Sequence, residues 1–232
     1  MSANKSILIC RCFARGLLSK SDEAEGLVTS GRAAVVPDLC KAAAEKDPVL
    51  REIAAAEAPV IYACHPRAVR ALFDFAGSPL PSNTELINLR NPSRNPFVES
   101  DPVWFPVIDG DRCTNCGQCF EFCLFGVYKK DTAGKVRVTN PQNCKNNCPA
   151  CARICPVAAI IFPKVGESPI NGAEISDEEA LKANIKINVD EILGGDVYAA
   201  LNARKQKRQS LLNQKKIEQA LAERKKCAEE KE

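Results

Sequence analysis

Cysteines at short, regular spacings are the residues of this 232-residue chain that most directly suggest chemistry, and the chain has 13 of them. Eight form two runs with the spacings C-x2-C-x2-C-x3-C and C-x3-C-x2-C-x3-C: Cys113, Cys116, Cys119 and Cys123, then Cys144, Cys148, Cys151 and Cys155. Three closely spaced thiolates can wrap one side of a cubane iron-sulfur cluster while a remote fourth thiolate completes its ligation. The spacing therefore predicts two [4Fe-4S] clusters.

The fourth cysteine of each run is expected to serve the cluster of the other run, as in two-cluster proteins with this spacing. The first cluster is then assigned to Cys113, Cys116, Cys119 and Cys155. The second is assigned to Cys144, Cys148, Cys151 and Cys123. Zinc is the alternative metal, since Cys₄ zinc sites also use thiolates two residues apart. Such sites use two pairs rather than a triad with a distant fourth thiolate, so the spacing favours clusters.

These cysteines resemble those of the bacterial dicluster ferredoxin family, and the resemblance covers residues 101–164. It departs from the family in two places. The first run ends in Cys123-Leu124 where the family usually has Cys-Pro, and the second run has one extra residue between Cys144 and Cys148. Neither departure removes a thiolate, but the extra residue is expected to reshape the loop around the second cluster.

Composition limits the class of protein. With 45% hydrophobic and 26% charged residues, the chain is long enough for one medium or two small domains. Its first 18 residues show neither the apolar segment nor the cleavage site of a secretory signal, so the free cysteines indicate a reducing, cytoplasmic location. No apolar run approaches the roughly 20 residues of a spanning helix. The net charge of +3 is too small to indicate a nucleic-acid partner.

Residues 1–90 are expected to form a small α/β domain with a parallel sheet. The expected strands are 7–10, 33–36, 60–63 and 85–89. The expected helices are 22–28, 39–56 in two pieces broken at Pro48, and 66–76. Four further cysteines follow or end these strands: Cys10, Cys12, Cys40 and Cys64. Because parallel strands end at a shared edge, this arrangement predicts a third site for a metal or cluster there.

The segments Ile9-Cys10-Arg11-Cys12, Asp38-Leu39-Cys40 and Ala63-Cys64-His65-Pro66-Arg67 are similar to the N-terminal domain of the flavin-containing subunit of heterodisulfide reductase. The resemblance implies a third [4Fe-4S] cluster held by Cys10, Cys12, Cys40 and Cys64. It ends after about ninety residues, because no G-x-G-x-x-G turn follows a strand. No flavin or NAD site is therefore expected.

Three other interpretations of these four cysteines stay open. They can pack as buried apolar residues, or they can hold zinc. Cys64 can also be a reactive thiol, because it precedes a helix opened by Pro66 whose N-terminus would lower the pKa of the thiol. His65, the single histidine of the chain, is badly placed to share a proton with Cys64 because adjacent strand residues point to opposite faces. We interpret His65 as a surface or helix-start residue.

The rest of the chain completes the predicted organisation. A linker over 91–100 leads into an α+β ferredoxin-like dicluster domain over 101–165, built from two halves of strand, ligand loop, helix and strand. Coil and a charged helical tail occupy 166–232, with a short helix over 176–184 and a long one from about 196. The tail is interpreted as a helix for docking or for homo- or hetero-oligomer formation, and Cys227 as an exposed thiol that is not a ligand.

The sequence thus predicts an electron-transfer protein or subunit with no catalytic site of its own, passing single electrons through two or three clusters. Its partner would be a redox protein or a larger oxidoreductase complex. The first alternative is a two-cluster ferredoxin whose N-terminal domain is a zinc-binding or metal-free scaffold. A thiol enzyme using Cys64 is the third interpretation.

Overall fold

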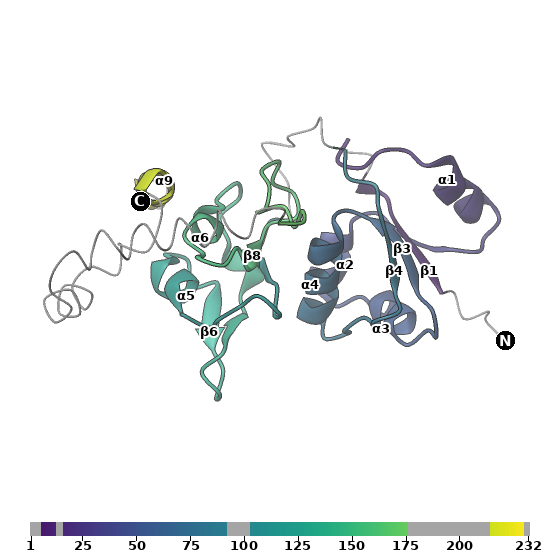
Figure 1. Cartoon of the computed structure of the whole chain (residues 1–232), viewed down its shortest axis with the longest axis horizontal. Coiled ribbons are helices and arrows are strands. Elements are labelled where there is room, and N and C mark those ends of the chain that lie inside the picture. Colours follow the sequence, from purple (N-terminus) through teal and green to yellow (C-terminus); the bar gives the residue numbers. More distant parts are fainter. Residues whose placement is uncertain (1–5, 13–15, 92–102, 176–213, 230–232) are drawn as a thin grey trace, which may run out of the picture.

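The computed structural model describes residues 6–12, 16–91, 103–175 and 214–229 (Figure 1). The expected linker over 91–100 lies almost entirely outside these ranges, as do the expected helix over 176–184 and the first part of the long helix. Within the described residues, no helix has the length and apolar character needed to cross a membrane.

A four-stranded parallel sheet forms the centre of residues 6–91. Its strands are ordered β2-β1-β3-β4, and Leu8 of β1 lies opposite Ala34 on one side and Ile61 on the other. The strands are β1 (Ile7–Cys10), β2 (Ala34–Val36), β3 (Val60–Ala63) and β4 (Glu85–Asn88). The helices between them are α1 (Asp22–Thr29), α2 (Leu39–Glu45), α3 (Pro48–Ala54) and α4 (Pro66–Ala76). The predicted parallel sheet is present, and the helical segment breaks before Pro48 as expected.

Polar caps and prolines determine where these helices begin. Asp38 caps α2 by accepting hydrogen bonds from the backbone N–H groups of Cys40 and Lys41. The Asp47 carboxylate caps α3, and Pro48 occupies its first turn. A left-handed glycine, Gly77 (φ 79°), ends α4. The sequence therefore defines each helix locally, before packing is considered.

The sheet is covered on both faces. The alternation of side chains along β1 and β3 sends Leu8 and Ile61 toward α2, α3 and α4, and sends Ile9 and Tyr62 toward α1. In Figure 1, α1 lies on the opposite side of the sheet from these three helices. The largest group of buried side chains belongs to the face covered by α2, α3 and α4, and it includes Cys10, Cys12 and Cys40.

Residues 103–175, the cysteine-rich region, contain two short antiparallel strand pairs, β5 with β8 and β6 with β7. The first half consists of β5 (Val107–Ile108), α5 (Gln118–Phe122) and β6 (Tyr128–Lys130). The second half consists of β7 (Val136–Val138), a 3₁₀ turn (Pro141–Asn143), α6 (Ala150–Arg153) and β8 (Ile160–Ile161). The expected order of strand, ligand loop, helix and strand therefore occurs twice.

The cysteine-rich region packs directly on α4. Phe105, Val107 and Ile161 belong to the same buried cluster as the core of the N-terminal sheet, and the rings of Phe105 and Phe75 lie 5.0 Å apart. Arg67 crosses the boundary with three hydrogen bonds, to the Asp109 carboxylate (2.9 Å) and to the backbone carbonyls of Ala158 (2.8 Å) and Ala173 (2.9 Å). These contacts hold the two regions together.

The described part of the tail is α9 (Gln214–Glu229), which packs on α6. Ala220 of α9 is completely buried beside Ala150 and Ile154. Glu223 accepts a 2.8 Å hydrogen bond from Arg153 in the same contact. The tail helix therefore docks on the cysteine-rich region of its own chain.

Candidate metal centres

The first cysteine run forms a loop between β5 and α5. Two left-handed residues, Asn115 (φ 55°) and Gly117 (φ 80°), separate its three closely spaced cysteines. These turns let the loop curl while Cys119 enters α5 as a buried residue and Cys116 stays exposed. The loop therefore presents thiols from several directions, as a cluster site requires.

Cys155 lies with this first group, although it belongs to the second run. The pKa of Cys119 is raised to about 12. Burial is the largest cause, and the nearby thiols of Cys155, Cys116 and Cys113 act in the same direction. Burial also raises the pKa of Cys155, and the nearby Cys116 raises it further. Four thiols, one of them from the other half of the repeat, thus influence one another.

A second group forms around Cys151. Burial raises the pKa of Cys151, and Cys144, Cys148 and Cys123 act in the same direction. Cys123 comes from the first run, so each group again contains one distant thiol. All four residues line one cavity, whose walls include Phe122, Phe125 and Val127.

Donors directed at the sulfurs fit anionic cluster ligands. The Tyr128 hydroxyl donates to the Cys151 sulfur at 3.0 Å, and the backbone N–H of Ala159 donates to the Cys155 sulfur at 3.2 Å. Such hydrogen bonds stabilise thiolates and adjust the reduction potential of a cluster. The thiol sets, their donors and the apolar surroundings therefore fit two [4Fe-4S] clusters.

Residues 105–156 match the family model described as "4Fe-4S dicluster domain". The chain carries a dicluster ferredoxin domain. An uncharacterized ferredoxin of Methanocaldococcus jannaschii is 48% identical over 64 residues, which are 27% of this chain and 43% of that protein. The pyruvate synthase subunit PorD of the same organism is 34% identical over 55 residues, 24% of this chain and 62% of that subunit. The chain thus covers less than two thirds of either relative, and no solved structure matches it closely enough to count as a relative.

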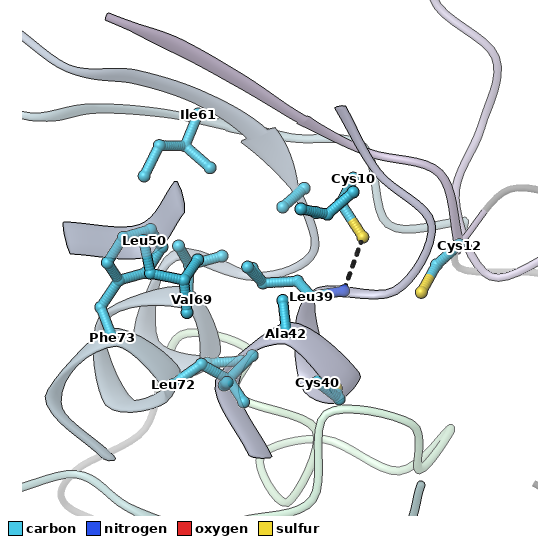
Figure 2. Packing of buried hydrophobic residues seen from close by; sticks show 14 of the residues in the cluster. Cys10, Cys12, Leu39, Cys40, Ala42, Leu50, Ile61, Val69, Leu72 and Phe73 are labelled. Carbon is cyan, nitrogen blue, oxygen red and sulfur yellow. Dashed lines mark hydrogen bonds between the residues drawn. The ribbon is translucent and has the colours of Figure 1, made fainter. Parts of the chain in front are cut away.

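The four N-terminal thiols lie near the carboxyl ends of β1 and β3 and at the start of α2. The pKa of Cys12 is raised first by a hydrogen bond with Cys10 and then by burial. Burial raises the pKa of Cys40, with smaller contributions from Cys12 and Cys64. In Figure 2 the Cys10 sulfur accepts a hydrogen bond from the backbone N–H of Leu39, and Cys40 is the next residue of α2; the bond is 3.3 Å long. The structure therefore brings together the thiols that the sequence places far apart.

Positive groups of the boundary lie beside these thiols. Lys164, only 5% exposed at its side chain, donates to the Asp38 carboxylate at 2.7 Å and lowers the pKa of Cys40 against the effect of burial. Burial lowers the pKa of Arg90, whereas Cys64, Cys12 and Cys40 raise it. Arg90 also donates to the Val165 carbonyl at 2.9 Å. The N-terminal thiols are therefore bordered by cations that contact the dicluster domain.

The third interpretation, in which Cys64 is a reactive thiol, is not favoured by the surroundings of Cys64. Burial and the nearby Cys12 raise the pKa of Cys64 to about 12, opposite to the direction expected at a helix start. His65 is the N-cap residue of α4, as interpreted from the sequence, and its Nδ1 lies 3.2 Å from the Asn88 amide nitrogen. Burial lowers the pKa of His65, which Arg90 and Arg67 lower further.

The prediction that Cys227 is an exposed thiol was wrong. It is 6% exposed and lines the cavity of the second thiol group. Arg67, Asp38 and Lys164 are further residues whose roles were not predicted. Asp38 and Arg67 each belong to a segment that the sequence singles out, but the partners of Arg67 lie 42 to 106 residues away and Lys164 lies 126 residues from Asp38. Within the described residues, no three His, Cys, Asp or Glu side chains are placed to hold a single metal ion.

Proposed function

We propose that this chain is an electron-transfer protein or subunit that relays single electrons through three [4Fe-4S] clusters to or from a partner oxidoreductase. Two clusters belong to the dicluster domain and one to the N-terminal sheet. The observation that carries the proposal is that Cys10, Cys12, Cys40 and Cys64 lie near one another and beside Lys164 and Arg90, which both contact the dicluster domain.

The ligand assignment follows the two groups of neighbouring thiols. We assign the first cluster to Cys113, Cys116, Cys119 and Cys155. We assign the second to Cys144, Cys148, Cys151 and Cys123. The mutual effects of these thiols on their pKa values support this division, because each group draws three thiols from one run and one from the other. When bound, the clusters supply reversible one-electron chemistry, and the chain supplies their spacing and surroundings.

The N-terminal thiols are assigned to a third cluster rather than to zinc. The N-terminal thiols affect one another's pKa values, so they lie near enough to interact. The segments that carry them resemble a domain that binds a [4Fe-4S] cluster, and this resemblance favours a cluster. Arg90 and Lys164 fit such a centre, because four thiolates around a cluster or a zinc ion carry a net negative charge.

The packing between the two regions supports electron exchange inside the chain. Cys40 shares a cavity with Trp104 and Phe162, whose rings lie 5.3 Å apart. Trp104 in turn packs in the buried cluster that contains Cys119 and Cys151. Electron transfer slows steeply with distance, and here packed side chains connect the N-terminal thiols to those of the dicluster domain. This continuous packing favours a relay.

A larger oxidoreductase is the proposed partner. One of the two relatives is, by its name, a subunit of pyruvate synthase, which supports a role for this chain in a multi-subunit system. Affinity capture of the full chain from anaerobic native extract, followed by mass spectrometry, tests this part. Co-purification of a redox enzyme in stoichiometric amount is expected. Recovery of the chain alone would contradict a stable complex.

The number of clusters is tested by measuring iron, acid-labile sulfide and zinc per chain in anaerobically purified protein. Three cubanes give about twelve irons, and a variant with Cys10→Ser and Cys12→Ser should hold about eight. A matched variant with Cys113→Ser and Cys116→Ser should also hold about eight, with a different electron paramagnetic resonance spectrum. About eight irons in both the parent and the first variant would overturn the third cluster. If the parent holds one zinc per chain and the first variant holds none, the third site binds a structural zinc ion instead of a cluster.

A further inference from the structure

Five thiols, rather than four, surround the second group's cavity. Beside the four assigned to the second cluster, Cys227 of α9 lines the same cavity and is 6% exposed. A cubane with four irons accepts one protein thiolate at each iron, so four thiolates complete its ligation. One of the five thiols is therefore surplus at any moment.

Cys148 and Cys227 share one corner of this cavity. Both side chains line it, and Cys148 packs on the small buried cluster that contains Ala220 of α9. Cys144 also lies near Cys227, whereas the Tyr128 hydroxyl engages the Cys151 sulfur instead. Among the four assigned thiols, Cys148 is the one that packs on the buried cluster containing a residue of α9.

Specific contacts of α9 position Cys227 at this corner. One turn before it, Glu223 accepts the 2.8 Å hydrogen bond from Arg153, and the side chains of the pair are 24% and 10% exposed. The Arg224 guanidinium lies 5.3 Å from the centre of the Phe122 ring. Together with the completely buried Ala220, these contacts fix both the position and the rotation of α9. Cys227 is thus oriented by packing and does not reach the cavity by chance along an exposed helix.

The loop of the second run differs at the same place. Three residues separate Cys144 from Cys148, compared with two between Cys113 and Cys116, and the third of them, Asn147, is left-handed (φ 58°). The extra residue gives Cys148 a position that differs from that of Cys116. Cys116 is exposed in the first group. It is the matched control for Cys148, because no second thiol is proposed to replace it.

We propose that Cys227 is an alternative ligand of the second cluster and exchanges with Cys148 at a single iron. The inference rests on the proposed function, because it requires a cluster in this cavity. The exchange is redox-neutral. When a cluster is bound, the Cys227 sulfur would bond to the iron as the bond to the Cys148 sulfur breaks, and the proton of the incoming thiol would pass to the departing thiolate. Because α9 carries one of the two ligands, its docking is coupled to the ligation of the cluster.

The test uses the full chain, purified anaerobically, with iron and sulfide counted per chain. Cys148→Ala and Cys227→Ala are each expected to retain the parent content, because the other thiol serves the iron. The double variant is expected to lose between about one and four irons, with a [3Fe-4S] signal at the lower loss. Cys116→Ala should lose iron as a single variant, because no second thiol is proposed for its corner.

The outcomes separate this inference from the proposed function. A parent protein with far fewer than about eight irons would overturn the proposed function itself. A parent with full iron content, but a Cys148→Ala variant that loses as much iron as the double variant, would overturn only the exchange. Circular dichroism and the signal of the first cluster, measured on every variant, distinguish local loss of a ligand from misfolding.

Detaching α9 gives a second test that leaves Cys227 in place. Ala220→Asp introduces a charge at a completely buried position between α9 and α6. Alone, it should keep the parent iron content, because Cys148 still serves the cluster. Combined with Cys148→Ala, it should lose iron like the double cysteine variant. Full iron content in this combination would overturn the proposal.

Discussion

Lys164 lies 2.7 Å from Asp38, and both side chains are buried although 126 residues separate them in the sequence. Asp38 uses its other carboxylate oxygen to cap α2 at Cys40, and Lys164 also donates to the Val103 carbonyl at 2.9 Å. This ion pair therefore joins the start of the helix that carries Cys40 to the segment that follows β8. It links the third proposed centre to the dicluster domain.

Lys164→Met should destabilise the protein by about 3–5 kcal/mol, because it breaks a buried ion pair by removing the cation that lies 2.7 Å from the Asp38 carboxylate. Urea denaturation of the anaerobic protein measures the change. In the double variant with Asp38→Asn, most of the loss should disappear, since asparagine still caps α2 and carries no charge. A double variant as unstable as Lys164→Met alone would show that the loss comes from packing and not from breaking the ion pair.

Arg67→Lys should cost about 2–4 kcal/mol, because an ammonium group cannot reach Asp109 and both backbone carbonyls in the arrangement that the guanidinium uses. Arg137→Lys is the matched control. Its guanidinium pairs with Asp131 at 3.1 Å, but the side chain is 61% exposed, so the expected change is below about 0.5 kcal/mol. Equal effects of the two substitutions in urea denaturation would contradict a structural role for the boundary contact.

The sequence predicted local structure well because the signals are local. Asp38, Asp47 and Pro48 define helix starts by hydrogen bonds and backbone restrictions within a few residues. The expected strands differ from the observed ones by at most one residue at an end, since each is a short apolar run between polar turns. The gathering of the N-terminal thiols followed from the shared edge of a parallel sheet. Their ligation, like the assignment within the dicluster domain, stays a prediction.

The contacts between distant segments could not be predicted in this way. Cys227 is surrounded in the sequence by charged residues, and its burial depends on where α9 docks. The apolar stripe of the tail is irregular, so it indicated neither a partner nor a face. Ala220 is a single small residue, yet its complete burial on α6 decides the contact. A single sequence gives no information about which surface such a residue meets.

Gly172→Ala should destabilise the protein by about 2–4 kcal/mol. A Cβ at this position would lie 2.6 Å from the Ala68 Cβ and 2.9 Å from its backbone nitrogen, and the backbone is left-handed (φ 89°). Gly134→Ala is the control, because Gly134 is also left-handed (φ 75°) but a Cβ there would meet open space. It should cost only about 1 kcal/mol. A difference of less than about 0.5 kcal/mol between the two variants, comparable to the error of such measurements, would mean that the loop can move away from α4.

Tyr128→Phe should lower the reduction potential of the second cluster, because the hydroxyl donates a 3.0 Å hydrogen bond to the Cys151 sulfur. A donor to sulfur stabilises the reduced, more negative state of a cluster more than the oxidised state. Losing about 1 kcal/mol of this difference corresponds to roughly 40 mV for a one-electron couple. Redox titration followed by electron paramagnetic resonance measures the shift. Tyr62→Phe is the control, since that hydroxyl donates to Glu23 at 2.8 Å and should leave this potential unchanged. An unchanged potential in Tyr128→Phe, with iron content intact, would contradict this prediction. It would mean that Cys151 is not a ligand of the second cluster, or that its sulfur accepts no hydrogen bond from Tyr128 once the iron is bound.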